Sequence, residues 1–381
     1  MFTKSLGKNQ RQRRRLVAVL LAGAMALAAC GDDDDTATVG DDPEVTQPTA
    51  STASDETESE APSASSGEGI DLEPLASSTA VTVGMPVDLE LFAPVILADS
   101  FGEYEDANLD VEFVSAPQSD LITMLGTGQV DVVLGSFQPA VYNAIHSGLE
   151  VRAVAPLMHS PGENKEGLWV PADMAEGLPE SLDGATIASI TGLGSNIMIP
   201  IGKYLEDNGM SITDVELERI AGADTITALE QGVVDAAWLG APYFLEAEER
   251  GLGEWVFGYE PGMQGTAIFF GERLLNDERE VGEQFVAATA RTVRDHLQGD
   301  YKSDPEVVEA LTTALGVDEE TLTRTAPLEF HPNMYMPTEA PELQQRYTLE
   351  YPDLLLYSEP LPEDQLFDLG LLEGLGLGAE E

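Results

Sequence analysis

Cysteine is almost absent from this chain. Cys30 is the only one among 381 residues. One thiol excludes an internal disulfide, a zinc site built from several cysteines and a Cys-x-x-Cys redox pair. The four histidines (His146, His159, His296 and His331) do not have the spacing of metal ligands. We therefore expect no metal site and no cofactor, and a fold that depends on its apolar core.

Basic residues are scarce as well. Lysine and arginine total 18 against 69 aspartates and glutamates, which gives a formal net charge of −51. Binding to nucleic acid or to anionic lipid headgroups rewards patches of Lys and Arg. We therefore expect neither partner. Such an acidic surface suits surroundings of high ionic strength, where salt screens the repulsion between like charges.

Sequence motifs of catalysis are missing. The chain has no His-Glu-x-x-His, no Gly-x-Ser-x-Gly and no phosphate-binding P-loop. Gly192-x-Gly194 begins like a dinucleotide fingerprint, but position 197 is Ile where the third glycine would stand. We expect no catalytic residue and no enzymatic activity.

The longest apolar run lies near the N-terminus. Six basic residues precede it, and it extends over 16–29, which is too short to span a membrane and typical of a signal peptide. It ends in Leu27-Ala-Ala-Cys30-Gly31, which resembles the bacterial lipobox. That resemblance implies cleavage of the signal peptide 1–29, lipidation of Cys30 and an extracytoplasmic protein anchored to the membrane. The alternative is an uncleaved anchor in which Cys30 is incidental.

Residues 30–79 are predicted to be an acidic, disordered linker. The segment begins with four aspartates and continues in Thr, Ser, Pro and Glu, without a basic or aromatic residue. It has too little apolar surface to offset its conformational entropy. A solvated spacer is the favoured interpretation over a cation-binding acidic run.

From residue 80 onward, short apolar strands alternate with helical segments, which predicts an α/β fold with parallel or mixed sheets. An internal repeat supports two similar units. Residues 120–131 (DLITMLGTGQVD) and 224–235 (DTITALEQGVVD) agree at seven of twelve positions, and each is followed by a Leu-Gly. The repeated pattern predicts a helix, a glycine stop and a strand. Asp120 and Asp224 stand where helix N-caps are expected.

Residues 80–260 resemble the NMT1/THI5-like and SsuA-like periplasmic binding proteins. The matching stretches are Ala107–Val114, Gly128–Gly135, Leu182–Ala188 and Gly232–Trp238. The resemblance implies a two-lobed type II binding-protein fold with the ligand between the lobes. It implies the extracytoplasmic solute-binding subunit of an ABC importer, which we expect to be a monomer whose partners are a permease and an ATPase.

The predicted division of the chain follows the repeat. Residues 80–175 with 262–360 form lobe I, and residues 180–260 form lobe II. We expect an acidic, loosely held tail over 361–381, because this segment is rich in Gly and Glu.

Loops that leave the carboxyl ends of parallel strands converge at one edge of a sheet and lead into helix N-termini, where ligands bind. The loop 191–196 fits best, since its two glycines allow close approach and Ser195 and Asn196 add polar groups. Ser195 could instead cap its own helix, and Phe137 and Tyr243 could instead pack at a hinge. The full set of predicted ligand-binding residues is Phe92, Gln118, Ser136, Phe137, Gln138, Thr191, Gly192, Gly194, Ser195, Asn196, Asp224, Gly240, Pro242 and Tyr243.

The ligand class follows less directly from the sequence. Relatives of this kind take sulfonate, nitrate, pyrimidines or vitamin precursors. Lys203 and Arg219 are the only basic residues of lobe II before Arg250. This shortage of cations favours a neutral or partly aromatic ligand. Two alternative functions stay open: a cell-surface ligand sensor without transport, and a dehydratase on the same fold. The predicted signal peptide disfavours the dehydratase.

Overall fold

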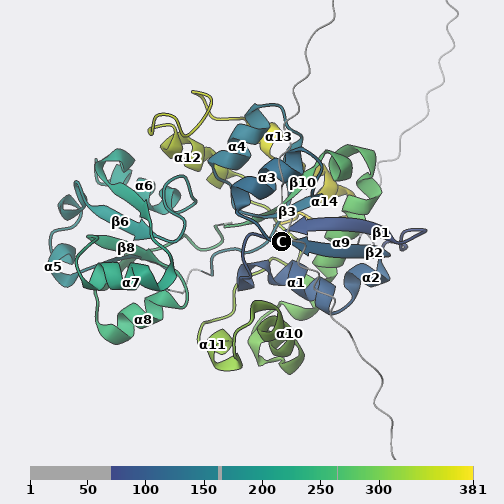
Figure 1. Cartoon of the computed structure of the whole chain (residues 1–381), viewed down its shortest axis with the longest axis horizontal. Coiled ribbons are helices and arrows are strands. Elements are labelled where there is room, and N and C mark those ends of the chain that lie inside the picture. Colours follow the sequence, from purple (N-terminus) through teal and green to yellow (C-terminus); the bar gives the residue numbers. More distant parts are fainter. Residues whose placement is uncertain (1–69, 162–164, 264, 381) are drawn as a thin grey trace, which may run out of the picture. The chain divides into compact units, whose positions relative to one another are not determined.

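The computed structural model describes residues 70–161, 165–263 and 265–380. The predicted signal peptide, Cys30 and most of the predicted linker lie outside these residues. The strands form two separate five-stranded sheets (Figure 1). They are β1 (Thr79–Gly84), β2 (Leu109–Val114), β3 (Val132–Gly135), β4 (Val151–Pro156), β5 (Gly167–Val170), β6 (Thr186–Ser189), β7 (Glu216–Arg219), β8 (Ala236–Leu239), β9 (Glu254–Phe257) and β10 (Ala267–Gly271).

The first sheet has the order β2-β1-β3-β10-β4. β1 pairs in parallel with β2 and β3, whereas β10 runs antiparallel between β3 and β4. Figure 1 shows α3 and α4 on one side of this sheet and α1 and α2 on the other. The helices around this sheet are α1 (Ala93–Ser100), α2 (Glu103–Asp106), α3 (Gln118–Gly126), α4 (Pro139–His146), α9 (Arg279–His296), α10 (Pro305–Leu315) and α11 (Glu319–Thr323).

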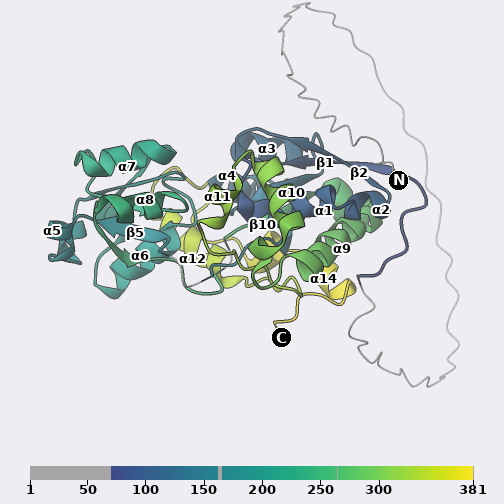
Figure 2. The same ribbon diagram turned by 90° about the horizontal axis from the view of Figure 1, so that it is seen from below.

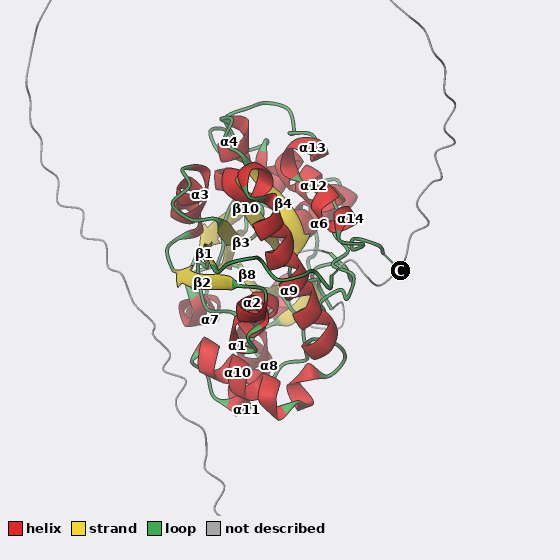
Figure 3. Ribbon diagram, turned by 90° about the vertical axis from the view of Figure 1, so that its right-hand side faces the viewer, coloured by secondary structure: helices red, strands yellow, loops and turns green. Residues whose placement is uncertain are grey.

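Helix α9 and the residue after it bury an apolar face. Val281, Phe285, Val286, Val293 and Leu297 are all buried. Figure 2 shows α9 and α10 beside α1, and residues of all three helices belong to one apolar core with the sheet. Figure 3 shows the strands, in yellow, between the helices that cover them.

The second sheet repeats this plan in the order β7-β6-β8-β5-β9. β6 pairs in parallel with β7 and β8, and β5 runs antiparallel between β8 and β9. Helix α6 (Met198–Asp207) packs on one face of the sheet, while α7 (Gly222–Glu230) and α8 (Tyr243–Arg250) pack on the other. Two mixed α/β sheets covered by helices confirm the predicted fold class.

The internal repeat has the same structural role in both sheets. In each copy the last aspartate accepts a hydrogen bond from a backbone N–H of the neighbouring strand: Asp131 from Thr82 at 2.8 Å and Asp235 from Thr186 at 2.9 Å. The first aspartates, Asp120 and Asp224, lie inside the first turns of α3 and α7. Neither caps its helix, because the N-cap positions are Pro117 and Ala221. The predicted N-caps are therefore wrong.

The boundary between the predicted lobes also changes. The sequence assigns 80–175 to lobe I, but β5 pairs with β8 and β9 in the second sheet. Short α5 (Ala172–Ala175) contacts β9. β5 has only four residues, and the sequence around it shows no hydrophobic period. Its sequence therefore does not indicate which sheet it joins. β10 pairs with β3 and β4, so the chain re-enters the first sheet at Ala267.

The predicted linker is too long at its end nearest β1. Ile70 and Leu75 are buried in the core of the first sheet. The backbone oxygen of Ile70 accepts a hydrogen bond from Arg291 at 2.8 Å, and that of Glu73 accepts one from Gln284 at 2.6 Å. Apolar side chains and these two anchors hold the residues just before β1.

The predicted loose tail is wrong as well. Leu366, Phe367, Leu371 and Leu372 are buried. Phe367 forms a parallel bridge with Ala153 of edge strand β4. The segment covers the otherwise unpaired edge of β4 and buries its own leucines, and both effects favour its packing on the first sheet. The remaining helices are α12 (Glu339–Thr348), α13 (Glu363–Leu366) and α14 (Gly370–Gly374).

The described part of the chain holds no helix whose length and apolar content would let it cross a membrane.

Candidate functional site

The two loops that follow β3 and β6 meet through one side chain, Gln344 of α12. Its amide nitrogen donates to the backbone oxygen of Phe137 at 2.9 Å and to that of Gly194 at 3.1 Å. Its amide oxygen accepts from the Tyr142 hydroxyl at 2.7 Å. Only 1% of Gln344 is exposed. A buried amide with its partners satisfied fixes the two loops relative to each other.

Glycine is required where the loops touch. Gly194 has a φ of 87°, and a Cβ there would lie 2.8 Å from Cγ of Pro139, at the start of α4. Gly192 has a φ of 69°. Side chains at these positions would be strained and, at Gly194, would push the loops apart. The sequence analysis expects both glycines to let a ligand approach the loop; in the structure their close neighbours are Arg219 and Pro139.

Ser195 is buried and its hydroxyl bonds within its own turn. It donates to the backbone oxygen of Gly192 at 2.7 Å and accepts from Thr191 at 2.9 Å. Gly192 in turn donates its N–H to the Ser189 hydroxyl at 2.7 Å. Helix α6 begins only at Met198, so Thr191–Asn196 forms a loop and not the first turn of the helix.

Asn196 connects this loop to the segment between β9 of the second sheet and β10 of the first. Its amide donates to the backbone oxygen of Gly265 at 3.4 Å and accepts from the Tyr259 hydroxyl at 3.1 Å. Beside it, a cavity of about 10 Å³ is lined by residues of both loops and of α12. That volume is the least that one water molecule occupies. The residues around it are Phe137, Asn196, Ile199, Gly265, Thr266, Ala340, Pro341 and Gln344.

The predicted aromatic contacts in the first sheet belong to its core. Phe92 is 3% exposed and Phe137 is 7% exposed. The Phe137 ring lies 5.1 Å from that of Phe269 and 5.3 Å from that of Phe367. Of the two predicted roles for Phe137, the structure shows packing.

The polar residues around Phe137 are half-buried. The Gln118 amide donates to the backbone oxygen of Ser136 at 2.6 Å, so Gln118 supports the loop after β3. Gln138 occupies the N-cap position of α4, but its side chain makes no hydrogen bond to the first turn of the helix.

The loop after β8 lies over a carboxylate that the sequence analysis missed. A Cβ at Gly240 would lie 3.4 Å from Oε1 of Glu166. Burial raises the pKa of the Glu166 carboxyl to about 7. Burial and the charge of Glu166 also raise the pKa of Tyr259 well above its usual value. Glu166 stands just before β5, where no strand was expected, so nothing in the sequence placed it at this edge.

Pro242 is exposed, and the Tyr243 hydroxyl lies against Gly222 at the start of α7. Asp224 is exposed on that helix. The structure thus brings Phe137, Gly194 and Asn196 together, and groups Tyr243 with the N-terminal turn of α7.

Arg219 lies beside the loop 191–196. It is the last residue of β7 and pairs with Ser189, the last residue of β6. Its Nε donates to the backbone oxygen of Ile190 at 3.2 Å. A Cβ at Gly192 would lie 2.8 Å from its Cβ. The sequence analysis counted Arg219 without placing it. Its position at the end of a strand was the signal available.

No group of three or more His, Cys, Asp or Glu side chains arranged to hold a metal occurs among the described residues.

Comparisons with known proteins agree with this architecture. A model of the NMT1/THI5-like family matches residues 90–299. No curated protein sequence matches the chain. The periplasmic aliphatic sulphonate-binding protein SsuA from Escherichia coli superposes with a TM-score of 0.54 at 18% identity, over 77% of this chain and 92% of that one.

Two further solved structures have the same fold. The periplasmic nitrate-binding protein NrtA from Synechocystis PCC 6803 gives a TM-score of 0.56 at 15% identity, over 78% of this chain and 88% of that one. The zinc-bound ligand-binding component of an ABC-type import system from Staphylococcus aureus gives 0.58 at 14% identity, over 78% and 98%. These neighbours are binding proteins. Since the family model covers more than half of the sequence, the chain belongs to the NMT1/THI5-like family.

Proposed function

We propose that this protein is the solute-binding subunit of an ABC importer and captures a small molecule outside the cytoplasm. The observation that carries the proposal is the meeting of the loops after β3 and β6 at Gln344. These loops follow equivalent strands of two related units, and ligands bind at the carboxyl edges of such sheets. Membership of the NMT1/THI5-like family supports the same function.

The ligand belongs to one of the classes that the resemblance implies: a sulfonate, nitrate, or a pyrimidine or related vitamin precursor. The two sheets are the cores of two lobes, and ligand binding shifts the population toward the form in which both lobes contact it. A permease then recognises that form. The predicted binding residues Thr191, Asn196, Asp224 and Tyr243 belong to the second lobe of this site.

A thermal-shift screen tests the proposed function. The purified protein is heated with methanesulfonate, nitrate, thymine, a flavin and bicarbonate, each in low and in high salt. A ligand present at 100 times its dissociation constant adds about 2.7 kcal/mol to the free energy of unfolding. We expect at least one of the first three compounds to raise the melting temperature. A folded protein that responds to none of them contradicts capture of these classes.

The membrane anchor has its own test. Cys30→Ala removes the only thiol that could be lipidated. We expect the variant to move from the membrane fraction to the soluble fraction of cells, since one lipidated residue is the whole predicted attachment. Ser51→Ala in the predicted linker is the matched control and should stay with the membrane. A Cys30→Ala variant that stays membrane-bound rules out the lipobox.

A further inference from the structure

His159 lies where the two crossovers between the sheets pair with each other. The first crossover leads from β4 to β5, and the second leads from β9 to β10. The backbone N–H of Ser160 donates to the Met263 oxygen at 2.9 Å, and that of Gly262 donates to the Ser160 oxygen at 2.9 Å. His159 donates its own backbone N–H to the Glu329 oxygen at 2.9 Å. These bonds hold His159 at the connection between the two sheets.

The imidazole of His159 is buried without a partner. Only 5% of the residue is exposed, and neither ring nitrogen has a hydrogen-bond partner of normal geometry among the described residues. A buried polar group without a partner costs free energy. An apolar side chain of similar size would fill the same space without this cost, so packing alone does not account for a histidine here.

The ring of His331 lies against that of His159, with 6.1 Å between the centroids, but it offers no acceptor. Its Nδ1 accepts from the backbone N–H groups of Asn333 at 3.2 Å and Tyr335 at 3.4 Å, and its Nε2 bonds to the Glu380 oxygen at 3.2 Å. Both of its nitrogens are therefore in use.

The other charged side chains on the segments around His159 are occupied elsewhere or exposed. Glu260 of the second crossover pairs with Lys203, and Arg294 of α9 donates to the Pro332 oxygen at 2.9 Å. Glu329 is exposed. In the described part of the chain, no carboxylate bonds to the His159 ring.

A charged imidazole needs acceptors for two N–H groups, and this site supplies neither. Burial and the charge of His331 lower the pKa of His159 to about 4, and the backbone of Tyr335 raises it only in part. When the crossovers open, the ring returns to water, where the pKa of histidine is about 6.5. The opened form thus binds the proton first, and the stability of the paired crossovers falls as the pH drops from about 6.5 to about 4.

We infer that His159 makes the connection between the two sheets acid-sensitive: the crossovers stay paired while the ring is neutral and separate when it binds a proton. One buried side chain thereby couples the pairing of the crossovers to the pH of the surroundings. This property goes beyond the proposed function and does not depend on the ligand.

Hydrogen exchange of the purified full-length protein, measured by mass spectrometry, tests the inference. The backbone N–H groups of Gly262 and Gly265 report opening of the second crossover, because they donate to the oxygens of Ser160 and Met158. His159→Leu removes the titrating ring and keeps a side chain of similar size. His146→Leu is the matched control, since His146 is exposed at the end of α4.

Exchange is compared at about pH 7.5 and about pH 5, on the two sides of the ordinary histidine range. We expect the ratio of exchange rates, wild type over His159→Leu, to rise about 10- to 30-fold at the lower pH, since only the opened wild type binds the proton in this range. The ratio of wild type over His146→Leu should not change. A ratio for His159→Leu that is the same at both pH values overturns the inference.

An NMR titration of the wild-type imidazole signals gives a second measurement that needs no folded His159→Leu. Replacing the other three histidines one at a time assigns the His159 signal. We expect the His159 ring to stay neutral at about pH 5 in the folded protein, below the range in which a solvated histidine binds its proton. A ring already protonated at that pH overturns the inference as well.

Discussion

Lys302→Met should lower the free energy of unfolding by about 3–5 kcal/mol, the usual result of removing one partner of a buried ion pair. The Lys302 side chain is 4% exposed and that of its partner Glu90 is 17% exposed, with 2.8 Å between Nζ and Oε1. Methionine fills the space of the lysine stem but leaves the Glu90 carboxylate buried without its cation. Urea denaturation of the purified chain measures the loss.

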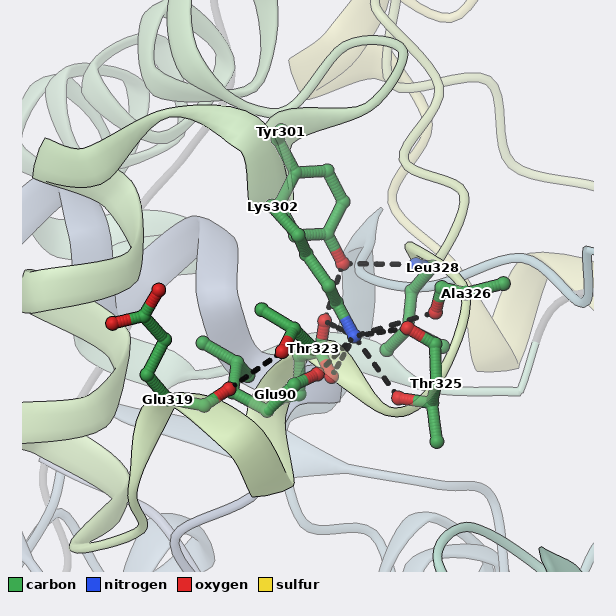
Figure 4. A network of polar contacts seen from close by, with 9 residues as sticks. Glu90, Tyr301, Lys302, Glu319, Thr323, Thr325, Ala326 and Leu328 are labelled. Atoms are coloured by element: carbon green, nitrogen blue, oxygen red, sulfur yellow. Dashed lines mark hydrogen bonds and ion pairs between the residues drawn. The ribbon is translucent and has the colours of Figure 1, made fainter.

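The surroundings of Lys302 explain why its removal costs so much. Figure 4 shows its Nζ surrounded by oxygens. Besides Glu90, it donates to backbone oxygens of Leu322 at 3.0 Å and Thr325 at 3.2 Å, and to the Thr325 hydroxyl at 3.0 Å. The Tyr301 hydroxyl donates to Glu90 at 2.6 Å. One ammonium group thus ties the turn before α1 to the loop after α11.

Lys203→Met is the matched control for this prediction. Lys203 pairs with Glu260 on the surface, where both side chains are about half exposed or more. Exposed ion pairs contribute about 0–1 kcal/mol. An effect of Lys302→Met no larger than that of Lys203→Met would show that the buried pair does not stabilise the fold. The double variant Lys302→Met with Glu90→Gln should recover part of the loss, because no unpaired charge remains buried.

The fold was predictable where the sequence repeats itself. The pattern at 120–131 recurs at 224–235, and both copies fold as a helix followed by a parallel strand. The hydrogen-bond partners of the last aspartate in each copy were not predictable from local spacing. Asp131 and Asp235 each accept a hydrogen bond from a strand residue 49 positions earlier in the chain, and only the folded sheet brings these groups together.

The site was predictable only at the level of loops. Parallel strands end at one edge of their sheet, so strand ends predict that 136–138 lie at the edge of the first sheet and 191–196 at the edge of the second. The environment of each side chain depends on distant segments. Gln344 lies in a helix that the sequence analysis did not single out, and it reaches Phe137 across 207 residues. Glu166 and Arg219 likewise acquire their roles from neighbours across the sheet.

The C-terminal segment was misjudged because Gly, Pro and acidic residues interrupt its leucines. The segment is held by edge strand β4, where the Asp368 N–H donates to the Ala153 oxygen at 3.0 Å. Arg279 of α9 also pairs with the Asp368 carboxylate at 2.6 Å. Local sequence patterns do not indicate partners that lie so far away in the chain.

Phe367→Ala should therefore destabilise the protein by about 3–5 kcal/mol, the range for removing a buried aromatic side chain from a core. Phe367 is 6% exposed, and its ring lies 5.3 Å from that of Phe137. The exposed Leu356 provides the matched control, because 65% of it is in contact with solvent. Leu356→Ala should change the free energy of unfolding by less than about 0.5 kcal/mol.

A chain that ends at Pro360 extends the same prediction. It loses the buried side chains of α13 and α14 and exposes the edge of β4, so we expect it to unfold at lower urea concentration than Phe367→Ala. If the shortened chain instead unfolds at the same urea concentration as the full chain, the segment contributes no stability and is a loose tail. Because Phe367 packs on Phe137, whose backbone oxygen binds Gln344, Phe367→Ala should also weaken ligand binding by more than Leu356→Ala does. Equal affinities of the two variants would show that the C-terminal segment supports the core of the first sheet without positioning the loop after β3.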